Sequence, residues 1–227
     1  MNYKNLLLIT SRKGSVRIKN KNIYKVNKIP LISYTLSYAK KHVSKYCIAY
    51  TSTDCEESKK LSLKHQIPTL SRKKKLANNT VSHFNVIRDA IDQLNKKNIY
   101  FEYLTLLQPT SPLRNENLIK NSIKILDKNK SFSSLIELVK IQNYTGKIKK
   151  NNVWVPDYFD KRSQDIPKSY MPTGNIFVFR ISKTFMIDSF YGKKTYSLIN
   201  NSRKWVNIDY VEDLMFFRSI LNGEKHI

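Results

Sequence analysis

Cysteine, glycine, acidic residues and long apolar runs are all scarce in this sequence of 227 residues. The only two cysteines, Cys47 and Cys55, give no disulfide framework and no metal-ligand spacing, and Cys47, within an apolar run, is expected to be a core residue. No apolar run reaches the roughly 18–20 residues that span a bilayer. The N-terminus also lacks the order of basic, apolar and small residues that marks a signal peptide. These features predict a cytoplasmic protein without membrane insertion.

The shortage of acidic residues gives the chain a strong positive charge. It has 41 Lys and Arg against 17 Asp and Glu, a formal net charge of +24. Such a charge is often found in proteins that bind nucleic acids or membrane surfaces. However, 32 of the 41 cations are Lys, and they are scattered from end to end instead of being gathered in one segment. We therefore expect that nucleic acid is not the main partner.

The order of apolar runs and helical patterns predicts the fold class. Short buried strands are predicted at 6–9, 47–51, 103–107, 133–138, 174–179 and 205–209. Helices are predicted at 30–39, 58–65, 82–94, 117–126 and after residue 209. This alternation predicts an α/β fold with a mostly parallel sheet and helices on both faces. The length fits a single domain, residues 1–227, with an irregular excursion at about 140–172.

The segment after the first predicted strand, "TSRKGSVRIKNKNI" at 10–23, has the residue types that bind phosphate. Ligands of open α/β sheets bind beyond the carboxyl ends of the strands. Gly14 allows close approach of the backbone, Ser15 offers a hydroxyl, and the cations Arg12, Arg17 and Lys21 offset phosphate charge. The spacing matches neither a P-loop nor a Gly-x-Gly-x-x-Gly fingerprint. Taken alone, the segment is either a phosphate-binding loop or one more basic stretch.

Several motifs resemble, in order and spacing, those of the CMP-sialic acid synthetase (acylneuraminate cytidylyltransferase) family. The N-terminal one is Arg12-x-Gly14-Ser15-x-Arg17-Ile18-x-x-Lys21-Asn22-Ile23, and the most specific is the unbroken run "LLQPTSPLR" at 106–114. The other matches are Pro30-Leu31-Ile32, Ser52-Thr53-Asp54, Leu76-Ala77 with Thr80 and Ser82, Gln164-Asp165-Ile166-Pro167 with Tyr170 and Gly174, and Ile208-Asp209 with Glu212-Asp213-Leu214. The resemblance covers about residues 5–221.

The resemblance implies a Rossmann-like nucleotidyltransferase fold and a defined reaction. CTP and an acidic nine-carbon 2-keto sugar (sialic, legionaminic or pseudaminic acid) would give the CMP-sugar and pyrophosphate. The anomeric hydroxyl of the sugar would attack the α-phosphate in line, while Mg²⁺ and cationic side chains stabilise the charge on the phosphates. The family also implies a homodimer formed through the excursion.

The resemblance also implies roles for individual residues. The nucleotide would be bound by Arg12, Gly14, Ser15, Arg17, Lys21, Asn22, Arg72 and Ser82. The sugar would be bound by Gln108, Thr110, Ser111, Arg162, Gln164 and Tyr170, with Arg162 and Gln164 often acting across the dimer interface in this family. Arg12, Lys21 and Asp209 would be catalytic, and Asp209 with Asn207 would bind Mg²⁺.

The chain departs from the family pattern at several positions. Asn207 replaces an Asp, and its amide is a weaker neutral donor to Mg²⁺ than a carboxylate. Asp209 alone can still hold one Mg²⁺ together with CTP oxygens and waters. Lys13 and Lys19 replace a Gly and a Pro, and we expect them to contribute less to CTP binding than Arg12, Arg17 and Lys21. Thr173 replaces the Asn that precedes Gly174.

Structural and functional alternatives remain at this stage. Asp54 and Asp209 both fit helix N-caps, with Glu212 completing a capping box for Asp209, and Arg72 and Arg162 fit solvated cations. The four histidines, His42, His65, His83 and His226, show no ligand spacing and are expected at the surface. The functional alternatives are a Kdo-type CMP-sugar synthetase, which would carry a Gln-Gly-Asp pattern at the central motif, and a non-catalytic homologue that binds anions or RNA.

Overall fold

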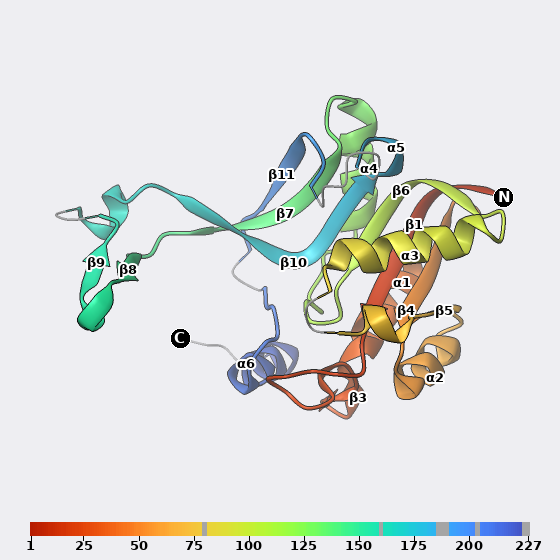
Figure 1. Ribbon diagram of the computed structural model, residues 1–227, viewed down its shortest axis with the longest axis horizontal. Helices are drawn as coiled ribbons and strands as arrows, with labels where there is room; N and C mark the ends of the chain where they lie inside the picture. Colours follow the sequence, from red (N-terminus) through yellow and green to blue (C-terminus); the bar gives the residue numbers. More distant parts are fainter. Residues whose placement is uncertain (79–80, 159–160, 185–190, 203–204, 224–227) are drawn as a thin grey trace.

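The computed structural model describes residues 1–78, 81–158, 161–184, 191–202 and 205–223 (Figure 1). The described residues form a central seven-stranded sheet in the order β11-β7-β10-β6-β1-β4-β5. Its strands are β1 (Asn2–Ser11), β4 (Cys47–Thr53), β5 (Thr69–Ser71), β6 (Tyr100–Leu107), β7 (Ser134–Ile141), β10 (Ser169–Arg180) and β11 (Thr195–Asn200). Strand β10 runs antiparallel to β6 and β7, and the other pairs are parallel. The predicted mostly parallel α/β sheet is confirmed.

The described helices lie close to their predicted positions, except for α5, which was not predicted. They are α1 (Leu31–His42), α2 (Glu56–Lys64), α3 (His83–Asn95), α4 (Leu118–Lys128), the short α5 (Ile181–Thr184) and α6 (Val211–Leu221). Pro30 precedes α1 with a φ of −58°, which suits the entry to a helix. Ser82 caps α3, because its hydroxyl accepts a hydrogen bond from the Asn85 N–H at 3.3 Å.

Strand β1 is buried on both sides, and its alternating side chains divide the core into two layers. Leu7 and Ile9 pack in one cluster with residues of α1 and α4. Leu6 and Leu8 pack in a second cluster with residues of α3. Successive side chains of a strand point to opposite faces, so α1 and α4 cover one face of the sheet and α3 covers the other. The predicted helices on both faces are confirmed.

The order of the strands places a crevice beside β1. From β1 the chain proceeds outward through β4 to β5, and then returns to place β6 on the opposite side of β1. Connections diverge at such a switch point, which leaves a crevice outside the carboxyl ends of the two strands. The carboxyl ends of β1 and β6, at Ser11 and Leu107, are therefore where this fold positions a ligand.

The excursion predicted at about 140–172 forms an arm that projects from the sheet (Figure 1). It carries a small antiparallel pair, β8 (Gly146–Ile148) and β9 (Trp154–Pro156), between the extended ends of β7 and β10. Apolar side chains of this pair are exposed in the single chain, among them Ile148 at 75% and Trp154 at 56%. A second small pair, β2 (Lys25–Val26) with β3 (Ile29–Pro30), precedes α1.

The prediction of a last strand at 205–209 is wrong. The described residues 205–209 form no strand, and the last strand is β11, which pairs with β7 in parallel. The alternation that suggested a strand is nevertheless present. Val206 and Ile208 are buried beside Leu214 and Phe217 of α6, whereas Asn207 and Asp209 face the other way, into the crevice.

Candidate active site

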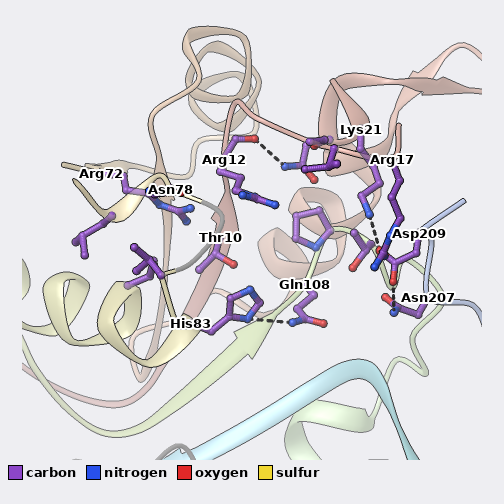
Figure 2. A pocket seen from close by; sticks show the side chains of 18 residues that line it. Thr10, Arg12, Arg17, Lys21, Arg72, Asn78, His83, Gln108, Asn207 and Asp209 are labelled. Carbon is purple, nitrogen blue, oxygen red and sulfur yellow. Dashed lines mark hydrogen bonds and ion pairs between the residues drawn. The ribbon is translucent and has the colours of Figure 1, made fainter. Parts of the chain in front are cut away.

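A cavity of about 550 Å³ opens at the carboxyl ends of β1 and β6 (Figure 2). Ten of the predicted site residues line it: Arg12, Ser15, Arg17, Lys21, Asn22, Arg72, Gln108, Thr110, Asn207 and Asp209. The remaining lining residues are Thr10, Val16, Leu76, Asn78, Val81, His83, Val86 and Pro109. Residues that are up to 199 positions apart in the sequence therefore meet in one pocket, at the end of the sheet where ligands bind in such folds.

The loop after β1 is held over this cavity at both of its ends. Asp54, at the end of β4, accepts a hydrogen bond from the Lys13 backbone N–H at 2.9 Å. The Asn22 side chain donates to the Arg12 carbonyl at 3.3 Å, and Ile18 is buried against residues beside α6. Asp54 thus anchors the loop and is not the cap of α2, since Cys55 occupies the N-cap position.

Asp209 is the centre of an ion-pair cluster at one wall of the cavity. Its Oδ1 lies 2.8 Å from Lys21 Nζ and 3.0 Å from Arg17 Nη1, and Lys21 also donates to the Ile208 carbonyl at 2.7 Å (Figure 2). Asn207 Nδ2 donates to Asp209 Oδ2 at 3.3 Å. The segment is fixed to the central motif by a 2.7 Å hydrogen bond from the Ile208 N–H to the Thr110 carbonyl.

The capping alternative for Asp209 is wrong. The helix after it has Tyr210 at its N-cap position, and Asp213, not Glu212, accepts from the backbone N–H groups of Asp209 and Tyr210, each at 2.8 Å. This capping leaves the Asp209 carboxylate directed into the cavity. The prediction that Asp209 binds a metal is therefore compatible with the local backbone structure.

Arg72 is not a solvated member of the basic run that follows it. Its side chain is 7% exposed, and Nη2 donates to the Ser52 carbonyl at 3.1 Å. Burial, together with the nearby Arg12, lowers the pKa of Arg72 to about 10, although Asp54 and Asp89 oppose this shift. Its Nε is buried without a hydrogen-bond partner among the described residues, while other atoms of Arg72 line the cavity.

The electrostatics of the cavity favour an anion. Among the described residues that line it, four are Arg or Lys (Arg12, Arg17, Lys21 and Arg72) and one, Asp209, is acidic. Several cations held around one cavity concentrate positive potential there, more strongly than the same charges scattered on a surface. The site can therefore bind a polyanion such as a triphosphate and stabilise negative charge that develops on it.

Among the lining residues that were not predicted for the site, His83 is the one with a titratable side chain, and it stands at the first position of α3. Its Nδ1 lies 3.3 Å from Gln108 Nε2 (Figure 2). Burial, followed by the charges of Arg72 and Arg12, lowers the pKa of His83 below its ordinary value. A neutral imidazole accepts from the Gln108 amide at Nδ1, which leaves Gln108 Oε1 as an acceptor for a ligand. No motif in the sequence signals this contact.

The residues fit a single Mg²⁺ only if a bound nucleotide supplies further oxygens. No group of three or more His, Cys, Asp or Glu suited to a metal occurs among the residues that the structure describes. Asp209 offers one carboxylate, whose Oδ1 is already paired with two cations, whereas Asn207 turns its amide nitrogen to Asp209 and its amide oxygen accepts from the Ser111 hydroxyl at 3.3 Å. Mg²⁺ is commonly held by one or two carboxylates together with substrate phosphates and waters. The donor set meets that minimum.

Six predicted site residues do not line the cavity. Ser82 caps α3, Gly14 lies in the loop where a Cβ added to it would meet no atom within 4 Å, and Ser111 is fully buried, with its hydroxyl 3.1 Å from the Thr173 carbonyl. Arg162, Gln164 and Tyr170 lie on the arm, away from the cavity of their own chain. There Arg162 pairs with Asp165 at 2.8 Å, and a small hollow is lined by Gln164 with Lys140, Gln142, Ser163 and Lys168. Thr80 and His226 fall outside the described residues.

No helix among the described residues is long and apolar enough to cross a membrane.

Comparison with known proteins identifies one family. A family model described as "Cytidylyltransferase" matches residues 6–216. The pseudaminic acid cytidylyltransferase of Campylobacter jejuni serotype O:2 is 31% identical over 220 residues, with 94% of each chain covered. The protein of the same description from serotype O:23/36 is 30% identical with the same coverage.

A solved structure supports the same fold. The CMP:2-keto-3-deoxy-manno-octonic acid synthetase complexed with CTP matches with a TM-score of 0.68, covering 98% of this chain and 100% of that chain. The sequences are 12% identical, so this match concerns the fold alone.

Proposed function

The chain belongs to the cytidylyltransferase family, and we propose that its cavity binds CTP and transfers CMP to an acidic nine-carbon 2-keto sugar, with release of pyrophosphate. The observation that carries this proposal is the clustering of Arg12, Arg17, Lys21 and Arg72 around one cavity at the carboxyl end of β1. A triphosphate is the nucleotide part that such a cluster binds best. The relatives supply the remaining information, namely that the nucleotide is CTP and the acceptor is an acidic sugar.

In this proposal the cationic residues perform the electrostatic part of the reaction. Arg12 and Lys21 contact the phosphates of CTP and stabilise the charge that develops on the leaving pyrophosphate. Ser15 and Asn22, from the same loop, add hydrogen bonds to the nucleotide. Hydrogen bonds of Asp54 and Asn22 within the protein hold the loop that carries these donors, and fixed donors favour catalysis.

We propose that Asp209, with Asn207 as a weaker neighbour, holds one Mg²⁺ together with CTP. When bound, the ion would neutralise phosphate charge and orient the α-phosphate. Lys21 and Arg17 hold the Asp209 carboxylate at the cavity wall. Asp209 then serves both as an anchor for the two cations and as the single carboxylate ligand.

The sugar is proposed to bind beyond the α-phosphate, near Gln108 and Thr110 at the end of β6. Pseudaminic acid is the favoured acceptor because the two relatives of about 30% identity are described as its cytidylyltransferases. The Gln108-Pro109-Thr110-Ser111 run argues against a Kdo-type enzyme, in which the resemblance implies a Gln-Gly-Asp pattern instead.

A homodimer is proposed to complete the sugar site. The arm projects from the sheet (Figure 1). Arg162, Gln164 and Tyr170 lie on it and do not line the cavity of their own chain, and the arm exposes apolar side chains such as Trp154. A second copy would bury these apolar residues and receive the polar ones beside its cavity. The location is proposed to be the cytoplasm, where CTP is made.

The test is a pyrophosphate-release assay with CTP, Mg²⁺ and a panel of acids: pseudaminic, legionaminic and sialic acid, with Kdo as the eight-carbon comparison. We expect release with at least one nine-carbon acid, highest with pseudaminic acid, and little with Kdo. Preference for Kdo would support the Kdo-type alternative. Absence of release with every acid, together with salt-sensitive RNA binding, would contradict the proposal and favour a non-catalytic homologue.

A further inference from the structure

Strand β10 contains a bulge that lies directly below Gln108. Pro172 pairs with Leu138 and Phe177 pairs with Ile136, so the four residues 173–176 stand opposite a single residue of β7, Glu137. We refer to residues 173–176 as the β10 bulge. Bulges interrupt regular pairing and direct local side chains, and they are frequent beside active sites.

Gly174 allows the bulge to approach the central motif. Its φ is +77°, a conformation that side chains with a Cβ rarely adopt. A Cβ built on Gly174 would lie 2.3 Å from Ser111 Oγ and 2.9 Å from Gln108 Oε1. Any larger residue would therefore displace both side chains, and Gln108 is the one that lines the cavity.

Arg114 joins the bulge to the backbone of Gln108. It donates from Nη2 to the Gln108 carbonyl at 2.7 Å, from Nε to the Asn175 carbonyl at 2.7 Å, and from Nη1 to Thr35 Oγ1 of α1 at 2.9 Å. The planar guanidinium thus connects three elements at fixed angles, which a lysine has no geometry to reproduce. Burial lowers the pKa of Arg114 to about 10, so the group remains charged at neutral pH.

Glu137 holds the same bulge from the opposite side. Its side chain is 6% exposed, and Oε2 accepts from Thr173 Oγ1 and from Asn175 Nδ2, each at 2.7 Å. Asn175 therefore connects Glu137 to Arg114 through its side chain and its carbonyl. A buried charge is costly unless it is compensated, and the hydrogen bonds from Thr173 and Asn175 compensate Glu137, whose charge in turn opposes the effect of burial on the pKa of Arg114.

We propose that Arg114 and Glu137 are positioning residues, which hold the β10 bulge against Gln108 and thereby set the shape of the sugar end of the cavity. This inference rests on the proposed function, because Gln108 is assigned to the sugar and not to CTP. It adds residues that touch neither substrate. Ser111 belongs to the same network, since its hydroxyl contacts the Thr173 carbonyl at 3.1 Å and Asn207 Oδ1 at 3.3 Å.

The experiment compares steady-state kinetics of Arg114→Lys, Glu137→Gln and Gly174→Ala with the wild type, varying the sugar and CTP separately. We expect the KM for the sugar to rise by about tenfold or more, because displacing a substrate contact by about 1 Å has effects of this size or larger. The KM for CTP should stay within about twofold of the wild-type value. Equal changes in both KM values, or loss of stability alone, would overturn the inference.

Arg180→Lys is the matched control. Arg180 is a buried arginine of the same strand, at its far end, with Nη1 3.2 Å from Glu102 Oε1 and Nη2 bonded to the Leu126 carbonyl. This variant should lower the melting temperature without changing the KM for the sugar. A rise in that KM would show that general loosening of β10 explains the effect, and would contradict a specific role for Arg114.

Hydrogen exchange gives a readout that needs no substrate. Arg114→Lys should speed amide exchange at 108–111 and 173–175, and Arg180→Lys should leave these segments unchanged. If the wild type turned over no acid, the proposed function would fail, and the exchange data would still decide whether Arg114 holds the bulge. Unchanged exchange at both segments in Arg114→Lys would overturn the positioning role.

Discussion

The two ends of the central sheet carry clusters of charged residues that differ in their ratio of cations to acids. At the amino end, Lys4 lies 2.7 Å from Glu102 and 2.9 Å from Asp127, and Arg180 lies 3.2 Å from Glu102. At the carboxyl end, the cavity lining within the described part of the chain has four Arg or Lys and a single Asp. With Lys130, which lies 3.6 Å from Asp127, three cations face two acids at the amino end, which we call the balanced end, whereas four face one at the carboxyl end, the unbalanced end.

The difference separates charge that stabilises the fold from charge that binds a ligand. The charged groups of the amino-end cluster contact one another and Tyr103. Tyr103 donates to Asp127 at 2.8 Å, and its ring centroid lies 4.9 Å from the guanidinium of Arg180. At the carboxyl end, Lys21 and Arg17 share one oxygen of Asp209. Such an excess of positive charge is unfavourable in the free protein and is offset when a polyanion binds. We therefore expect the anionic ligand to bind at the unbalanced end.

Removing the acid of the unbalanced end should have the largest effect on catalysis. Asp209→Ala is expected to lower kcat/KM by at least about 10³-fold, because both the proposed metal ligand and the anchor of Lys21 are lost. The melting temperature should change little, since Asp209 is at the edge of an open cavity. Pyrophosphate release and thermal unfolding measure the two effects. Glu116→Ala, which removes an acid with 82% side-chain exposure, is the control. Turnover of Asp209→Ala at the wild-type rate would exclude Asp209 from the metal site.

Replacing Asp127, an acid of the balanced end, should lower the stability of the fold slightly and leave catalysis unchanged. Burial alone would raise the pKa of Asp127, but hydrogen bonds from Lys4 and Tyr103 outweigh it and lower the pKa. The resulting stabilisation is present above the unfolded pKa of about 4 and is lost as the pH falls through the lower folded value. Asp127 is partly exposed, so we expect about 1 kcal/mol or less, a shift of about 2–4 °C or less.

Thermal unfolding at several pH values measures this contribution. Asp127→Asn should melt below the wild type at pH 6, and the difference should narrow as the pH falls below the unfolded Asp pKa of about 4 towards the lower folded pKa. Asp92→Asn, at an exposed position of α3, should show no such difference. A gap for Asp127→Asn that stayed constant from pH 6 to pH 3 would contradict the role of the ionised carboxylate.

The sequence predicted the layered fold well because its signals are local. The buried runs that became β1, β4 and β6 and the amphipathic pattern of α3 each lie within one element. The error at 205–209 has a physical cause. Apolar and polar residues do alternate there, but one set packs against α6 and the other faces the cavity, and the segment does not pair in a sheet. The true last strand, β11, was not predicted; its partly buried residues Tyr196 and Leu198 form too short a pattern.

Site residues were predicted where a motif directly follows a strand. They were missed where the site depends on contacts between residues far apart in the sequence. Lys21 and Asp209 are 188 positions apart, and the family resemblance alone assigns both of them to one site. His83 has no motif and lines the cavity only because α3 begins there. The proposed positioning roles of Arg114 and Glu137 depend on the β10 bulge, which no local pattern in the sequence predicts.

The most direct test of the account is calorimetric titration of CTP, at fixed Mg²⁺, into the wild type, Lys21→Met and Lys19→Met. Lys21 lines the cavity, whereas Lys19 is exposed two positions earlier in the same loop. The account predicts that Lys21→Met raises the Kd for CTP by about 30-fold, equivalent to about 2 kcal/mol, and that Lys19→Met leaves it nearly unchanged. Equal weakening by both substitutions would mean that general basicity, and not a built triphosphate site, binds the nucleotide.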